Sequence, residues 1–374
     1  MTISINQISM NKLKVIQLLP ELNFGGVERG VKDFSKALVK KGHQSIVISN
    51  GGLLQEEIEK NGGKHINLPI HKKRISSLLL SSKLKDIYEK ERPDVIHVRS
   101  RMPAWINFLA FKKLHQKPLL VSTFHGLYST PIYSQVMSKV DHAISISKTV
   151  KSYIKSTYKM TDDQITIIPR GCDSLQFNQD EIESSWLEDW YKEFPQTIGK
   201  KILTLPTRIT KWKGVDSFID LVEAIDSNDM HALVVGPVSE SKKRYYQTLL
   251  DKVNKKSLSD KITFTGSRND IANIYKISDI VYNLSIQPEP FGRTTIEAIS
   301  CGTPVAGWRH GGTQEILEDL FPQGLAELSN TDELKDVTLN ILNNNDKPLE
   351  NTFTSERMID STISLYYDLL NKSS

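Results

Sequence analysis

The sequence predicts an α/β protein made of two doubly wound, Rossmann-like domains, and three observations lead to this prediction. The chain has 374 residues, which exceeds the roughly 250–300 residues at which a single hydrophobic core stops growing. Short apolar runs alternate with helical periodicity in both halves, which is the pattern of a parallel sheet covered by helices. In each half, the first strand also runs through a glycine-containing loop into a helix, where open α/β sheets bind ligands.

The first half begins with an apolar strand at residues 14–19 and a helix with apolar residues at helical spacing. Gly25 and Gly26 join the two, so the backbone can approach a phosphate and the helix start can face an anion. The turn is not GxGxxG, so a dinucleotide site is not indicated. Further strands and helices are expected at residues 43–49, 53–61, 65–68, 77–89 and 95–98.

A continuous apolar strand at residues 118–124 ends at His125 and Gly126. Because ligands gather at the carboxyl ends of parallel strands, His125 is expected to face a cleft. Strands at 143–146 and 164–168 complete this half. The acidic and aromatic segment 176–199 has little strand pattern and is interpreted as the connection between an N-terminal domain, 1–175, and a C-terminal domain, 200–354.

The C-terminal domain opens with the strand KKILTLP, followed by Arg208 and Lys213 before Gly214 and a helix. Two cations in a loop at the carboxyl end of the first strand form a candidate clamp for a diphosphate. Strands are expected at 231–235, 261–266 and 279–284, a basic helix at 241–256 and an amphipathic helix at 355–370.

The most informative stretch is 288–315, PEPFGRTTIEAISCGTPVAGWRHGGTQE. Its apolar spacing predicts a helix that begins near Arg293 or Thr294, with Thr294 and Thr295 as possible caps. Glu289 then lies just outside the helix and Glu297 within it. A helix start attracts anions and carboxylates accept hydrogen bonds from hydroxyls, so this stretch is a candidate cradle for a sugar or ribose.

Composition narrows the setting of the protein. The sequence has no run of 18 apolar residues, and its start lacks the features of a signal peptide. Cys172 and Cys301 lie far apart, and His97, His125 and His142 show no metal-site spacing. We therefore expect a reduced, cytoplasmic protein without a metal site.

Charge is distributed unevenly along the chain. Residues 1–170 hold 27 Lys and Arg against 13 Asp and Glu, while the remainder is acidic. A basic half points to an anionic partner, and nucleic acid, an anionic membrane and a solvated surface remain open. Lys72, Lys73 and Arg74 precede the apolar run 78–80, which fits either a membrane-surface segment or a helix packed on the core.

The pattern E-P-F-G-x4-E-A, continued by G-T-P-V and the turn Gly311–Gly312 before Glu315, resembles the nucleotide-sugar signature of the family-four, or group 1, glycosyltransferases. This resemblance implies the GT-B fold, in which two Rossmann-like domains face each other across a cleft. It implies that the C-terminal domain, 200–354, binds the nucleotide-sugar donor and that the N-terminal domain, 1–175, lies on the acceptor side. It also implies that Glu289 contacts the donor sugar and Glu297 the ribose.

Further residues match patterns of the same family. The resemblance implies that Gly25 and Gly26 face the donor diphosphate or the acceptor, that His125 is the active-site histidine, and that Arg208 and Lys213 bind phosphate. The donor site would also include Gly266, Arg268, Phe291, Gly292, Arg293 and Thr294. Arg170 stands where many relatives have Asn, and the helix 355–374 would pack back on the first domain.

The implied activity is transfer of a glycosyl group from a nucleotide diphospho-sugar with retention at the anomeric carbon. No cofactor is expected beyond this co-substrate. The sequence lacks Asp-x-Asp, so no metal is expected either. We expect a glycan or lipid-linked acceptor of an envelope glycan such as lipopolysaccharide, peripheral binding to the inner face of the cytoplasmic membrane and no nucleic-acid partner. A sugar-nucleotide epimerase and a non-catalytic nucleotide-sugar-binding subunit are the alternatives.

Overall fold

The computed structural model describes residues 12–23, 25–72 and 74–373, and these form two compact units. The first unit contains the chain up to Ile146, residues 150–168 and residues 359–374. The second contains residues 147–149 and 169–358. Segment 176–199, which we interpreted as a connection, therefore belongs to the second unit.

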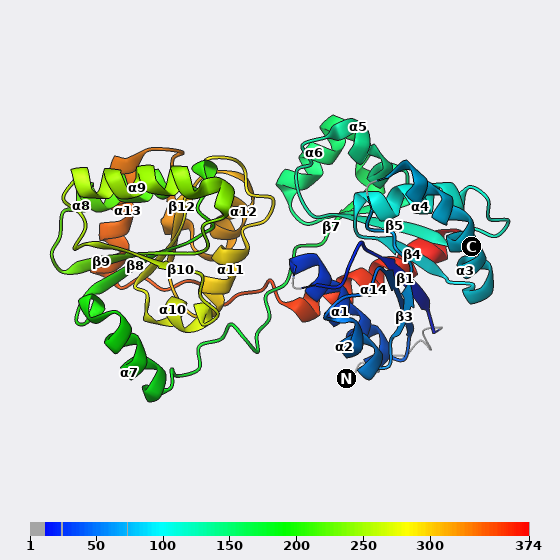
Figure 1. The fold of residues 1–374 in the computed structure, drawn as a ribbon, viewed down its shortest axis with the longest axis horizontal. Helices are drawn as coiled ribbons and strands as arrows, with labels where there is room; N and C mark the ends of the chain where they lie inside the picture. The colour runs from blue at the N-terminus through cyan, green and yellow to red at the C-terminus, as the bar shows by residue number, and fades with distance from the viewer. Residues whose placement is uncertain (1–11, 24, 73, 374) are drawn as a thin grey trace, which may run out of the picture. The chain divides into compact units, whose positions relative to one another are not determined.

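The first unit is built on a seven-stranded sheet of order β3-β2-β1-β4-β5-β6-β7, in which all neighbouring strands are parallel. Helices α1 and α2 cover one face, and α3 and α4 cover the other (Figure 1). The strands are β1 (Lys14–Leu18), β2 (Gln44–Ser49), β3 (Lys64–Asn67), β4 (Val95–Val98), β5 (Leu119–Phe124), β6 (His142–Ser145) and β7 (Ile165–Ile167). The helices are α1 (Gly26–Lys40), α2 (Gln55–Lys60), α3 (Leu80–Glu91), α4 (Arg101–Phe111), α5 (Pro131–Ser134), α6 (Lys148–Tyr158) and α14 (Ser355–Ser373), whose last part lies in this unit.

The second unit repeats this plan with a six-stranded parallel sheet of order β10-β9-β8-β11-β12-β13. Helices α8 and α9 lie on one face and α10 lies on the other (Figure 1). The strands are β8 (Lys201–Pro206), β9 (Met230–Val235), β10 (Ile262–Gly266), β11 (Ile280–Asn283), β12 (Val305–Trp308) and β13 (Leu325–Ala326). The helices are α7 (Ser184–Glu193), α8 (Val215–Ile225), α9 (Lys243–Lys255), α10 (Ile271–Ile277), α11 (Arg293–Ser300), α12 (Gly311–Leu320) and α13 (Thr331–Asn344).

These two sheets confirm the predicted fold class of two doubly wound, Rossmann-like domains. In each sheet the direction of winding reverses between two neighbouring strands, β1 and β4 in the first unit and β8 and β11 in the second. The helices that follow these two strands lie on opposite faces, so the loops diverge and leave a crevice at the carboxyl ends. The fold therefore directs attention to the loops after β1, β4, β8 and β11.

Helix α7 explains why segment 176–199 belongs to the second unit. Trp190 is only 2% exposed, and with Phe194 it joins a hydrophobic cluster that includes Leu233 of β9 and Ile274 of α10. The Trp190 indole also donates to the hydroxyl of Thr197, at 3.1 Å. The aromatic residues that we interpreted as linker are thus part of a core.

The helix after the basic triplet packs on the core of the first unit. Leu84 and Tyr88 of α3 are buried, and Tyr88 donates from its hydroxyl to Asn107 of α4 at 2.7 Å. Lys73 lies outside the described residues, and Leu79, in the 3₁₀ turn η1 (Ile75–Leu79), is 78% exposed. The core-packed alternative therefore holds for α3, and among the described side chains of η1 and α3 Leu79 is the large apolar residue that is exposed.

The C-terminal helix contributes a buried aromatic residue to the first unit. Tyr366 is fully buried, and its hydroxyl lies 2.5 Å from Nδ1 of His97 in β4. His97 also contacts the hydroxyl of Thr123 through Nε2, at 2.7 Å. Burial holds the pKa of His97 well below its ordinary value, so the ring is neutral and acts as a polar link in the core.

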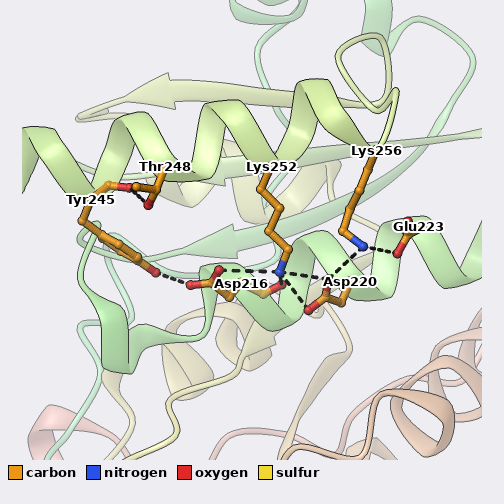
Figure 2. A network of polar contacts seen from close by, with 7 residues as sticks. All are labelled: Asp216, Asp220, Glu223, Tyr245, Thr248, Lys252 and Lys256. Carbon is orange, nitrogen blue, oxygen red and sulfur yellow. Dashed lines mark hydrogen bonds and ion pairs between the residues drawn. The ribbon is translucent and has the colours of Figure 1, made fainter.

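The basic helix α9 is held against an acidic row on α8 (Figure 2). Lys252 contacts Asp220 at 2.9 Å, Lys256 pairs with Glu223, and the Tyr245 hydroxyl donates to Asp216 at 2.5 Å. Exposed pairs of this kind contribute about 0–1 kcal/mol each. Lys252 and Lys256 are thus paired within the unit, and the network fixes the helix that follows Lys213.

Candidate functional site

Lys213 and Glu289 meet at the point where the winding of the second sheet reverses. Lys213 follows β8 and Glu289 follows β11, and their side chains form an ion pair that is 18% and 12% exposed, respectively. The Ser285 hydroxyl donates to the same oxygen, Oε1 of Glu289, at 2.6 Å. The ring of Trp212 lies 4.4 Å from the Lys213 nitrogen. This crevice therefore presents a cation, a carboxylate and a hydroxyl on rigid loops.

Gly214 explains how the two loops come so close. Its φ of +77° is in the left-handed region, and a Cβ at this position would collide with the carbonyl oxygen of Leu284. The backbone N–H of Ile286 also donates to the carbonyl of Trp212, at 2.8 Å. Only glycine permits this approach, so Gly214 sets the position of Lys213 relative to the loop that carries Glu289.

Arg208 lies in the same loop after β8 but is exposed. Its side chain is not part of the ion pair between Lys213 and Glu289. Its place at the carboxyl end of β8 leaves its guanidinium accessible to a ligand in the crevice.

The helix of the predicted cradle, α11, begins at Arg293, as the apolar spacing indicates. The predicted caps are wrong, because the N-cap is Gly292, with a φ of 97° and no side-chain cap bond. Thr294 and Thr295 instead lie beside Asn283, whose amide nitrogen is 3.4 and 3.3 Å from their hydroxyls. Gly292 supplies no side-chain cap, so the start of the helix can donate backbone N–H groups to a ligand, although the Thr295 N–H already donates to the Gly292 carbonyl at 3.1 Å.

Glu297 lies inside α11 and is only 8% exposed. Its Oε1 accepts a hydrogen bond from Arg293 at 2.9 Å, and the buried Tyr275 hydroxyl lies 3.5 Å from Oε2. Burial and the Glu297 charge raise the pKa of Tyr275 well above its ordinary value. Arg293 thus holds Glu297 in one orientation at the surface of the helix.

The turn at the start of α12 fixes the segment that carries Glu289. The N–H of Gly312 donates to the carbonyl of Glu289 at 2.8 Å. A Cβ on Gly312 would lie 2.5 Å from the Phe291 backbone, and one on Gly311 would lie 2.8 Å from the nitrogen of Glu289. Both glycines are therefore needed for the close packing of this segment on α12.

Three polar groups around these loops were not identified from the sequence. Ser285 bonds to Glu289, as described above, and the hydroxyls of Thr210 and Thr313 are buried without a hydrogen-bond partner in the described part of the chain. Thr313 adjoins Gly292, since a Cβ on that glycine would lie 3.2 Å from the threonine oxygen. Unpaired hydroxyls are able to bond to a polar ligand. Thr313 comes one residue after the Gly311–Gly312 turn and Ser285 one residue after the predicted strand 279–284, whereas the sequence gives no signal for Thr210.

Gly266 and Arg268 follow β10. Gly266 has a φ of 74° and open space around it. Arg268 donates to Asp270 at 2.7 Å and to Glu193 at 2.8 Å. These bonds raise the pKa of the guanidinium above its ordinary value and tie β10 to α7. The donor contact of Arg268 remains a prediction, and these bonds give the side chain a structural role.

The predicted residues of the first unit lie at the carboxyl ends of its strands. Gly25 is the N-cap of α1, which begins at Gly26, and the carboxylate of Glu28 folds back over Gly25. His125 follows β5 and is half-buried, and its backbone N–H donates to the Tyr128 hydroxyl at 3.4 Å. A helix start and an imidazole are thus available on this unit.

Comparison with known proteins follows the same division of the chain. The profile described as Glycosyltransferase Family 4 matches residues 24–174, and that described as Glycosyl transferases group 1 matches residues 188–356. A glycosyltransferase from Rickettsia africae has 29% identity and a TM-score of 0.82, over 97% of this chain and 100% of that protein.

Two further relatives extend over nearly the whole chain. The N-acetyl-alpha-D-glucosaminyl L-malate synthase of Bacillus anthracis is 23% identical over 96% of this chain and 98% of its own length. Anabaena HepE, whose structure contains UDP and glucose, has a TM-score of 0.71 and 19% identity over 96% of this chain and 98% of that protein. At this identity the HepE comparison concerns the fold alone.

Proposed function

Because the chain belongs to the family-four, or group 1, glycosyltransferases, it is a retaining glycosyltransferase that uses a nucleotide sugar, and we propose that its second unit binds this donor at the Lys213–Glu289 pair. The pair carries the proposal because it lies where an open α/β sheet binds its ligand. Lys213 and Arg208 bind the diphosphate, Glu289 contacts the sugar, and Glu297 contacts the ribose.

The chemistry requires stabilisation of a leaving nucleoside diphosphate. Charge builds up on this group as the bond to the anomeric carbon breaks, and cations and N–H groups held in place beforehand lower the barrier most. Lys213 is held by Glu289 and Trp212, and α11 opens with uncapped N–H groups at Gly292. These groups can stabilise the negative charge on the leaving diphosphate without changing their positions.

Transfer is favoured over the two alternatives from the sequence. An epimerase of similar shape requires a dedicated acid and base at the sugar, and the described groups around Glu289 are those suited to binding a diphosphate and hydroxyls. A non-catalytic binding subunit has no need of His125 on the first unit. A panel of nucleotide sugars tested by thermal shift, followed by nucleotide release with the stabilising compound, tests the proposal. A panel in which no nucleotide sugar raises the melting temperature would contradict it.

The reaction should not depend on a divalent cation. No three His, Cys, Asp or Glu side chains gather as a metal site within residues 12–23, 25–72 and 74–373, and the proposed ligands of the diphosphate are Arg208, Lys213 and the start of α11. We expect nucleotide release to continue at an unchanged rate in excess EDTA. Loss of activity that Mg²⁺ or Mn²⁺ restores would contradict this prediction.

We also propose that the acceptor is presented at an anionic membrane, as a lipid-linked glycan of the cell envelope. In the described residues no helix is long and apolar enough to span a bilayer. In the first unit, the side chain of Leu79 in η1 is 78% exposed and that of Ile132 in α5 is 83% exposed. Both elements adjoin α4, and no Asp or Glu occurs in residues 69–85 or 95–140. Exposed apolar side chains with basic residues around them are able to bind an anionic leaflet.

Vesicle binding should therefore depend on charge and on these apolar residues. Each basic side chain near the bilayer contributes about 1 kcal/mol, which salt weakens. We expect co-sedimentation with anionic vesicles, less at high salt, and a clear loss in Leu79→Glu and Ile132→Glu. Leu349→Glu, at a residue of the second unit that is 63% exposed, is the matched control and should bind as the wild type does.

A soluble acceptor is the second candidate, because the name of the Bacillus anthracis relative describes a sugar joined to malate, a small carboxylic acid. Equal recovery with neutral and anionic vesicles, or recovery independent of salt, would favour it over the membrane-bound acceptor. The assignment of the donor site is not affected by this choice.

A further inference from the structure

Arg99 lies where the winding of the first sheet reverses, directly after β4. Its backbone N–H donates to the carbonyl of Leu18 at the end of β1, at 2.9 Å. Its guanidinium donates to Oε1 of Gln17 at 2.8 Å and lies 3.5 Å from the hydroxyl of Thr123. The crevice of the first unit thus contains a guanidinium whose side-chain partners are neutral.

This guanidinium is partly withdrawn from water. The ring of Phe34 lies 5.2 Å from Cζ, and Nε is buried without a hydrogen-bond partner among the described residues. Burial lowers the pKa of Arg99, and the phenol of Tyr366 is the group that opposes this shift. An arginine nevertheless stays protonated. A partly buried guanidinium with neutral partners is stabilised most by an anion that accepts its hydrogen bonds.

Arg101, the first residue of α4, has similar surroundings. Its Nη1 donates to the hydroxyls of Thr130 at 3.1 Å and Ser134 at 3.3 Å. Its Cζ lies 4.9 Å from the ring of Tyr128. Arg101 therefore also combines hydroxyl and aromatic partners, and a guanidinium has five N–H groups with which to bond.

Other arginines of the chain, unlike Arg99 and Arg101, bond to carboxylates. Arg268, Arg293 and Arg309 each bond to a carboxylate within 3 Å. The sequence has no Asp or Glu in residues 95–140, the stretch that supplies Thr123 near Arg99 and the named partners of Arg101. The anion that completes this arrangement must come from elsewhere.

Both arginines contact residues that adjoin the predicted active-site histidine. Thr123, which lies near the Arg99 guanidinium, is in β5 two residues before His125. The hydroxyl of Tyr128, whose ring lies near Arg101, accepts from the His125 N–H. We propose that the acceptor bears an anionic group, a carboxylate or a phosphate, which Arg99 and Arg101 bind beside His125. The inference rests on the proposed function, since that function binds the donor on the second unit and leaves the acceptor to the first.

Calorimetric titration with inorganic phosphate and with succinate, at fixed ionic strength, tests this inference. The titrations use Lys213→Ala as the parent protein, so that anion binding at the proposed donor site is weakened. We expect Arg99→Gln and Arg101→Gln each to weaken binding of the preferred anion by about tenfold or more, the usual size for a charge-assisted pair. Arg244→Gln, at an exposed arginine of α9, is the matched control and should bind as the parent does.

The two anions distinguish the sources of the charge. Tighter binding of phosphate supports a phosphorylated or lipid-phosphate acceptor, and tighter binding of succinate supports a carboxylic acid. Binding of neither anion, or equal losses in all three variants, would overturn the inference. Arg99→Lys, which keeps the charge, should retain part of the affinity, and thermal melting identifies any variant that is unfolded.

Nucleotide-sugar binding by the variants with Lys213 intact separates this inference from the proposed function. Donor affinity should be unchanged in Arg99→Gln and Arg101→Gln. A protein that binds no nucleotide sugar but still binds the anion through these arginines would refute the proposed function alone. Donor binding without arginine-dependent anion binding would refute this inference alone.

Discussion

Replacing Lys213 by alanine should lower turnover by about 10²–10³, and Arg208→Ala should have an effect of similar size. Each substitution removes a cation from the diphosphate while it leaves as an anion. In Lys213→Ala, Glu289 also loses its counter-ion in a site where its side chain is only 12% exposed. The measurement is kcat from nucleotide release with the donor that the panel identifies.

Lys211→Ala is the matched control for this pair. Lys211 belongs to the same short 3₁₀ turn, Lys211–Lys213, but its side chain is exposed. Its removal should leave kcat within about twofold, since an exposed charge is screened by solvent. Near-wild-type rates in both Lys213→Ala and Arg208→Ala would show that the diphosphate is bound elsewhere.

Gly312→Ala should lower kcat by about 10² with a smaller effect on stability. The new Cβ would lie 2.5 Å from the backbone of Phe291, so the segment from Glu289 to Phe291 must move. Overpacking of this kind costs about 1–3 kcal/mol of folding free energy. A displacement of about 1 Å in a catalytic group has an effect on rate near 10²-fold. Steady-state kinetics and thermal melting measure the two effects.

Gly30→Ala is the control for the same change of residue. Gly30 lies inside α1, and a Cβ there would meet no atom within 4 Å. Alanine should therefore be neutral or stabilise the helix by up to about 1 kcal/mol, because glycine is a weak helix former. If Gly312→Ala also retained full activity, the close packing of α12 would not be what positions Glu289.

The strands of both sheets could be predicted because they are buried on both faces and appear as continuous apolar runs. Helix α4 was missed for a related reason. Its sequence, RMPAWINFLAF, is apolar on most sides and gives no helical period, although it lies between the predicted strands β4 and β5. Helix α7 was misinterpreted because its tryptophans lie in an acidic segment, and only the folded chain brings them against β9 and α10.

Within the candidate site, the sequence predicts the charged residues better than the hydroxyls and glycines that hold them in position. Lys213 and Glu289 lie 76 positions apart, and sheet topology predicts that their loops are neighbours. The hydroxyls of Ser285 and Thr313 have no such signal, because their role depends on which loop packs beside them. The capping prediction for Thr294 was wrong since a left-handed glycine started the helix instead.

The buried Tyr366 has a consequence for how the protein is made on the ribosome. The second unit is almost entirely one continuous stretch, residues 169–358, so nearly all of its contacts are available before the last residues emerge. The first unit begins at the N-terminus but takes its last core side chains from residues 359–374. Until these emerge, the face of its sheet around His97 lacks Tyr366. The part synthesised first therefore gains its last core contacts only through long-range closure of the chain, which is a slow kind of step in folding.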